Sequence, residues 1–157
     1  MDNVDTLEFL LGTWRVARSI EDHRSGTRGS FAGTASLARA PSAGGFALGT
    51  RAHYEEVGEL SFGDYVGPAR RSLEYVRLDN GALMLHFTDG RPFVDLDLSA
   101  GAWQSTHLCA DDRYEIATFV RSRNIILERW RVRGPATEYD AATTLRRSRH
   151  GLRTEEV

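Results

Sequence analysis

The chain has 157 residues, of which 41% are hydrophobic and 27% charged, values typical of one folded domain and not of a disordered segment. The formal net charge of −2 argues against a nucleic-acid-binding protein, which would show a basic excess. No apolar run approaches the ~18 residues of a membrane-spanning helix, and Met1 to Asp5 is acidic, unlike a secretory signal. Cys109 is the only cysteine, which excludes an internal disulfide, so we predict a cytoplasmic protein that does not bind membranes.

The first predicted element is a short helix over residues 5–11. Asp5 is placed to cap its start, Glu8 to reach back as in a capping box, and Gly12 to end it. From Thr13 onward, apolar and polar residues alternate with a period of two, which predicts β-strands. About ten strands are predicted, over residues 13–20, 31–37, 46–56, 72–78, 82–88, 92–98, 102–109, 113–121, 125–133 and 137–147.

The connections between these strands favour a barrel. After residue 69 nearly every connection is short enough to be a hairpin, and Asn80-Gly81 predicts a type I′ turn. A sandwich would need longer crossovers, so the predicted fold is an all-β, antiparallel up-and-down barrel of about 8–10 strands with a short N-terminal helix. Residues 57–68 form the one long connection, which is either a lid over the barrel mouth or a bulged strand. We predict one domain over residues 1–147 and a disordered tail over 148–157.

The two ends of the sequence resemble a known superfamily. The opening Phe9-Leu10-Leu11-Gly12-Thr13-Trp14 is similar to the start of the lipocalin-like, or calycin, barrels, in which a short helix leads into a Gly-x-Trp strand. This resemblance implies that the Trp closes the barrel floor and that an arginine of the last strand packs over it. Arg146 or Arg147 stands at the position expected of that arginine, where a guanidinium would make a cation–π contact with the indole.

Three internal motifs resemble a narrower group, a family of small, uncharacterised actinobacterial and fungal proteins. The motifs are Asp89-Gly90-Arg91-Pro92-Phe93 with its preceding Phe87-Thr88, His107-x-Cys109-x-x-Asp112-x-Tyr114, and Trp130-x-Val132-x-Gly134-Pro135. The resemblance implies a calycin-like fold without a settled activity. Relatives often carry a histidine after Arg-Pro-Phe, and here that position is Val94.

Strand alternation leaves two placements open for a group of polar residues, either in the barrel lumen or on the outer face. Periodicity favours the outer face for three of them, because leucines occupy the opposite face of the same strands, and it leaves His107 and Tyr114 undecided. The three are His86, Asp95 and Asp97.

Metal and thiol chemistry find little support in the sequence. Structural zinc needs four ligands and only one cysteine is present, whereas catalytic zinc would require His53, His86 and His107 to converge. We therefore predict no metal and no cofactor, with haem on His107 as a minor alternative. Cys109 lies two residues from His107, too far along a strand for a direct bond, and is predicted to be buried and inert. Asp89 and Arg91 are predicted to lock a turn by their own contact.

A pocket with one His, one Tyr and a carboxylate would allow general acid–base catalysis. The candidate catalytic residues are His107, Tyr114 and Glu56. Arg18 alternates with Trp14 and Val16 and would hold an anionic ligand group by paired hydrogen bonds. The other candidate ligand-binding residues are aromatic, namely Trp103, Tyr54, Phe62, Tyr65 and Phe31.

Two functions follow from these candidates. The first is a binding protein that holds a small, largely apolar ligand in the barrel interior. The second is a cofactor-independent enzyme, such as a cyclase or isomerase acting on a natural-product intermediate by shaping it and moving a proton. The predicted partner is a small-molecule ligand or substrate; the sequence allows a homodimer without requiring one.

Overall fold

The computed structural model describes residues 5–40 and 50–148. It contains one short helix followed by strands throughout. The helix is α1 (Thr6–Leu10), and the strands are β1 (Gly12–Asp22), β2 (Arg28–Arg39), β3 (Arg51–Phe62), β4 (Tyr65–Arg77), β5 (Leu83–His86), β6 (Pro92–Leu96), β7 (Ala102–Cys109), β8 (Asp112–Ser122), β9 (Ile125–Arg133) and β10 (Glu138–Arg147).

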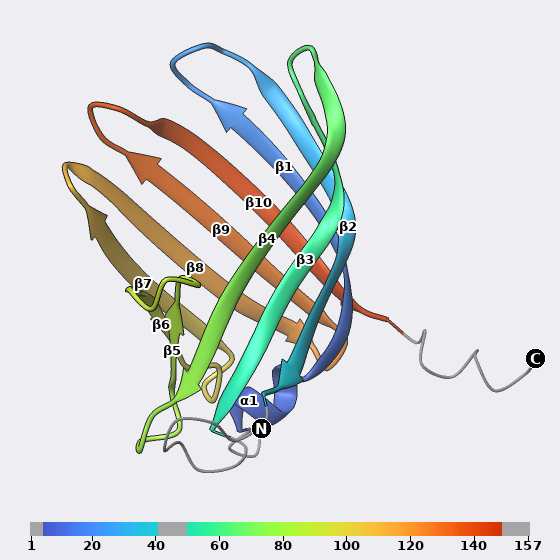
Figure 1. Cartoon of the computed structure of the whole chain (residues 1–157), viewed down its shortest axis with the longest axis vertical. Helices are drawn as coiled ribbons and strands as arrows, with labels where there is room; N and C mark the ends of the chain where they lie inside the picture. The colour runs from blue at the N-terminus through green and yellow to red at the C-terminus, as the bar shows by residue number, and fades with distance from the viewer. Residues whose placement is uncertain (1–4, 41–49, 149–157) are drawn as a thin grey trace, which may run out of the picture.

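The ten strands form one antiparallel sheet in the order β6-β5-β4-β3-β2-β1-β10-β9-β8-β7. The sheet curls until its end strands, β6 and β7, approach each other, so the molecule is a nearly closed barrel with α1 at one end (Figure 1). No backbone ladder joins β6 to β7 in the described chain, and side chains hold this seam: Asp95 accepts hydrogen bonds from Trp103 and Ser105 of β7. The predicted fold class is confirmed.

The floor of the barrel lies beside α1. Asp5 caps the helix by accepting a hydrogen bond from the amide of Glu8, as the sequence predicts. Trp14 is buried, and its indole N–H donates to the carbonyl of Leu10 at 2.9 Å. Arg147 lies over the Trp14 ring at 4.2 Å and donates to the carbonyl of Phe9, which ties the last strand to the first. Of the two arginines proposed from the calycin resemblance, Arg147 therefore occupies that place.

Strand alternation decides which side chains fill the interior. On β1, Trp14 and Val16 are buried while Arg15 and Ala17 face water, and each neighbouring strand repeats this pattern. Halfway up the wall two glycines, Gly33 of β2 and Gly58 of β3, stand opposite each other in register. A Cβ on Gly33 would lie 2.2 Å from the carbonyl oxygen of Val57, so only glycine permits this close approach of the two backbones.

Three local predictions are wrong. Of the two alternatives for residues 57–68, the lid is wrong and the strand is correct, although without a bulge, because β3 and β4 continue through these residues in unbroken register and meet at a tight turn containing Gly63. Cys109 is exposed, not buried, because it ends β7 at a surface turn. The Asn80-Gly81 hairpin forms, but only Gly81 has a positive φ, of +88°, whereas a type I′ turn requires positive φ at both central residues.

Other local predictions are confirmed or fall outside the described chain. The side chain of Arg91 donates to Asp89 at 2.7 Å and locks the predicted turn. Of the strand predicted over residues 46–56, residues 46–49 lie outside the described chain, as do residues 149–157 of the predicted tail. The only helix in the described ranges is too short to cross a membrane.

Candidate functional site

The strongest polar feature of the lumen is a cluster around Glu56 of β3. Glu56 is only 1% exposed, and its two carboxylate oxygens accept hydrogen bonds from Arg18 at 2.6 and 3.0 Å. The hydroxyl of Tyr54 donates to the same carboxylate at 2.6 Å, and Arg71 adds a longer contact at 3.2 Å. Two of the predicted site residues, Arg18 and Tyr54, are thus brought together by a third, Glu56.

Three of the five N–H groups of Arg18 are bound within the protein. Its two terminal nitrogens bind Glu56 in a bidentate pair, and its Nε donates to the hydroxyl of Thr143 at 2.8 Å. Its guanidinium also lies 5.4 Å from the centre of the Phe31 ring. Because these partners take three of the five N–H donors of Arg18 and Glu56 neutralises its charge, Arg18 is a weaker candidate for the anionic ligand group than the sequence suggests.

The charges around Glu56 set its protonation. Burial alone would raise the pKa of this carboxyl, but the hydrogen bond from Arg18 and the charge of Arg71 outweigh burial and lower the pKa to about 2. Burial, together with the neighbouring Tyr75 and Glu56, raises the pKa of Tyr54 well above its ordinary value. At neutral pH the cluster therefore contains an ionised carboxylate and a neutral phenol that donates to it.

Arg71 of β4 is the residue that sequence reasoning missed. Its side chain is 33% exposed, against 13% for Arg18, and its guanidinium lies 5.0 Å from the centre of the Trp130 ring. Its Nε is buried and has no hydrogen-bond partner among the described residues. Leu73 and Tyr75 are buried and face inward, and Arg71 lies two residues before Leu73. Strand alternation could therefore have predicted that Arg71 points into the barrel.

A pocket of about 280 Å³ lies directly against Arg71. Arg18 and Arg71 line it together with apolar and aromatic side chains from four strands, and Asp22 lies among its lining residues where β1 ends. The apolar and aromatic members are Ile20, Leu60, Phe62, Trp130, Tyr139 and Ala141. Phe62 is thus the one predicted aromatic ligand residue that lines this pocket. Burial raises the pKa of Tyr139, so its hydroxyl is neutral at physiological pH.

His107 and Tyr114 lie elsewhere in the lumen. Their ring centres are 6.0 Å apart, and both pack edge-on against Phe93, whose ring centre lies 5.1 Å from that of His107. The structure resolves their undecided placement in favour of the interior, but neither residue lines the 280 Å³ pocket. The His107 ring packs against three aromatic rings, those of Phe87, Phe93 and Tyr114.

The remaining candidates are dispersed. Trp103 donates to Asp95 across the β6–β7 seam, and Tyr65 is half exposed at the β3–β4 turn, where its hydroxyl donates to the carbonyl of Pro68. Neither residue lines the pocket. His53 binds Glu74 on the outer face, so the three histidines do not converge. Within residues 5–40 and 50–148, no group of three or more His, Cys, Asp or Glu side chains is arranged to hold a metal ion.

Comparison with known proteins places the chain in a family. Residues 10–147 match DUF6314, a family of unknown function. The chain belongs to this family. No curated protein sequence matches it.

Solved structures share the fold at low sequence identity. An S-type phycobiliprotein lyase, CPES, from Guillardia theta aligns with a TM-score of 0.69 at 11% identity, covering 95% of this chain and 94% of the lyase. A DUF3598-family protein of unknown function from Nostoc punctiforme aligns with a TM-score of 0.58 at 14% identity, covering 94% of this chain and 51% of that protein. Since both identities are low, these likenesses establish the DUF6314 barrel fold alone.

Proposed function

We propose that this DUF6314 protein binds a small molecule in its barrel lumen, and that the ligand has a largely apolar body and one anionic group held by Arg71. The observation that carries the proposal is the 280 Å³ pocket, in which an apolar and aromatic wall surrounds a guanidinium with an unpartnered Nε. A concave, mostly apolar pocket with a few polar groups is the usual form of a small-molecule site.

The different contacts of Arg18 and Arg71 support an anionic ligand. Arg18 and Tyr54 already satisfy the Glu56 carboxylate, so Arg71 contributes only the longer contact of 3.2 Å to it. The guanidinium of Arg71 lies over the Trp130 ring, and its donors other than the one that contacts Glu56 remain to bind a carboxylate or a similar monoanion. Asp22, also in the lining, would repel a second negative charge, which favours one charged end and an apolar remainder.

The geometry favours this function over the enzymatic alternative. A pKa of about 2 makes Glu56 a poor base at neutral pH, so we assign it the role of fixing Arg18, Arg71 and Tyr54. The remaining catalytic candidates, His107 and Tyr114, do not line the pocket at Arg71. Cyclase or isomerase activity would require the substrate to reach those two side chains in the neighbouring part of the lumen.

Two fluorescent probes of matched shape test the proposal. Anilinonaphthalene sulfonate carries an anionic group, whereas phenylnaphthylamine has the same aromatic body without it. We expect the protein to bind both, and the sulfonate more tightly. Arg71→Met should remove roughly tenfold or more of the affinity for the sulfonate, as expected for loss of a charge-assisted contact, and leave the neutral probe unchanged. Arg70→Met is the matched control, because Arg70 is the exposed neighbour that pairs with Glu55.

A second pair of variants tests the position of the site. Ala141 is 8% exposed and lines the pocket, whereas Ala142, next to it on β10, faces outward. Ala141→Phe should fill the pocket and abolish binding of both probes, and Ala142→Phe should change nothing. Binding that survives Ala141→Phe would refute a site in the lumen, and equal loss of both probes in Arg71→Met would refute the anionic contact.

A further inference from the structure

The outer face of strands β2, β1, β10 and β9 carries a second hollow, on the other side of the wall from the ligand pocket. These strands are neighbours in the sheet, and a groove of about 620 Å³ lies over them. Ser19 and Ala142, which stand opposite each other in register, form its floor. Arg28 lies on one side and Arg129 with Arg131 on the other, since β2 and β9 flank the central pair of strands.

The positive charge of this face is not balanced within the protein. Arg129 and Arg131 are exposed on β9, and Arg15 and Arg146 stand directly opposite each other on β1 and β10. In the described part of the chain, none of these four arginine side chains makes a hydrogen bond or an ion pair with another residue. Like charges opposed across two strands destabilise a sheet, so this face carries charge that the fold does not require.

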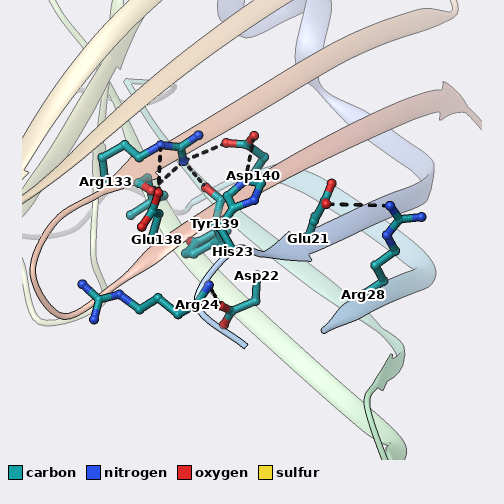
Figure 2. Close-up of polar contacts among 10 residues, drawn as sticks. Glu21, Asp22, His23, Arg24, Arg28, Arg133, Glu138, Tyr139 and Asp140 are labelled. Carbon is teal, nitrogen blue, oxygen red and sulfur yellow. Dashed lines mark hydrogen bonds and ion pairs between the residues drawn. The ribbon is translucent and has the colours of Figure 1, made fainter. Parts of the chain in front are cut away.

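The carboxylates on the same face are already occupied. Figure 2 shows Glu21 paired with Arg28, at 3.8 Å, and Asp140 accepting from Arg133 at 2.9 Å. His23 also binds Asp140, at 3.1 Å. Because Glu21 and Asp140 are engaged with these partners, they leave the charge of Arg129 and Arg131 available to another molecule.

We propose that this face is a docking surface for an acidic segment of a partner protein. Charge complementarity selects an anionic partner, and arginine is enriched in protein–protein interfaces. The small floor residues, Ser19 and Ala142, allow a peptide backbone to lie close to the sheet. The described outer faces of these four strands present no aromatic side chain on which a base would stack, which disfavours a single-stranded nucleic acid.

Fluorescence anisotropy with a labelled oligoglutamate peptide tests this surface. We expect saturable binding at low salt that weakens as the Debye length falls below about 10 Å. Exchanging Arg129 and Arg131 together for serine should weaken binding roughly tenfold, because two exposed ion pairs with the peptide are lost. The charge-matched control exchanges Arg70 and Arg91, which lie outside these four strands and pair with Glu55 and Asp89.

The outcomes separate specific docking from its alternatives. Loss of affinity in the Arg129/Arg131 variant, with the control unchanged, supports the proposal. An equal loss in both variants means that only net charge is sensed and overturns it, as does the absence of binding at low salt. A labelled single-stranded oligodeoxythymidine of the same charge that binds more tightly than the peptide overturns the choice of partner. Thermal unfolding of each variant, expected to be unchanged for exposed side chains, checks that the fold is retained.

Discussion

Replacing Glu56 with glutamine tests how the lumen is held together. The pKa of Glu56 falls from 4.5 to about 2 in the folded protein, which corresponds to about 3 kcal/mol of stability from its charged form, at about 1.4 kcal/mol for each pH unit. Removing the carboxylate also leaves Arg18 and Arg71 without their counter-charge, a change that typically costs about 3–5 kcal/mol in buried pairs. Glu56→Gln should therefore lower the free energy of unfolding by about 3 kcal/mol at pH 7.

The pH dependence of that loss follows from the sign of the shift. Because the folded pKa is lowered, the contribution of Glu56 is fully present above pH 4.5 and disappears as the pH falls toward 2. Protonated Glu56 resembles glutamine, so the two proteins should approach equal stability at the acid end of this window. Urea titrations at pH 7 and near pH 3 measure the difference in unfolding free energy.

The matched control is the neighbour Glu55, which is on the outer face and pairs with Arg70. Glu55→Gln should cost less than about 1 kcal/mol, as is usual for surface ion pairs. A Glu56→Gln variant that loses less than about 1 kcal/mol at pH 7 would contradict a stabilising role for the Glu56 charge. That role would equally be contradicted by a loss that stays constant between pH 7 and pH 3.

Two further substitutions test the barrel floor and wall by denaturant unfolding. Arg147→Met removes the cation over Trp14 and the hydrogen bonds to the carbonyls of Phe9, Leu11 and Arg123, and should cost about 2 kcal/mol. Arg146→Met changes an exposed and unpaired side chain and should cost less than about 0.5 kcal/mol. Equal losses in the two variants would contradict the role of Arg147. Gly33→Ala places a Cβ 2.2 Å from the Val57 carbonyl and should cost about 2 kcal/mol or more, so a neutral effect would show that the two strands separate without penalty.

Local sequence signals predicted the architecture well because a hairpin barrel is built from neighbours in the chain. The Asp5 cap, the Gly12-x-Trp14 entrance to β1 and the alternation after it need only short-range information, and the structure contains each of them. Short-range signals also explain why residues 57–68 were interpreted as a connection, since three glycines in this segment are typical of a loop. One of them, Gly58, instead accommodates the close approach of β2, a constraint set by the neighbouring strand.

The roles of the polar residues could not be predicted, because they depend on partners distant in the chain. Arg18, Glu56 and Thr143 come from three strands, and only their pairing shows that Arg18 is engaged and Glu56 strongly acidic. The unpartnered Nε of Arg71 becomes visible only when those bonds are in place. Sequence alternation predicts that a side chain points into the barrel, but it does not predict whether that side chain is paired within the protein or remains available to bind a ligand.

Because no backbone ladder joins β6 to β7 in the part of the chain that the structure describes, the barrel can widen along this seam more easily than a fully hydrogen-bonded barrel could. The contacts of Asp95 with Trp103 and Ser105 and the packing of Phe93 on His107 complete the circumference, and side-chain hydrogen bonds of this kind contribute only about 0.5–1.5 kcal/mol each. The wall can therefore widen along one line without breaking any pair of strands. Under the proposed function, a ligand larger than the pocket would be accommodated by separating β6 from β7, and the contacts across this seam would then limit the size of ligand that the barrel accepts.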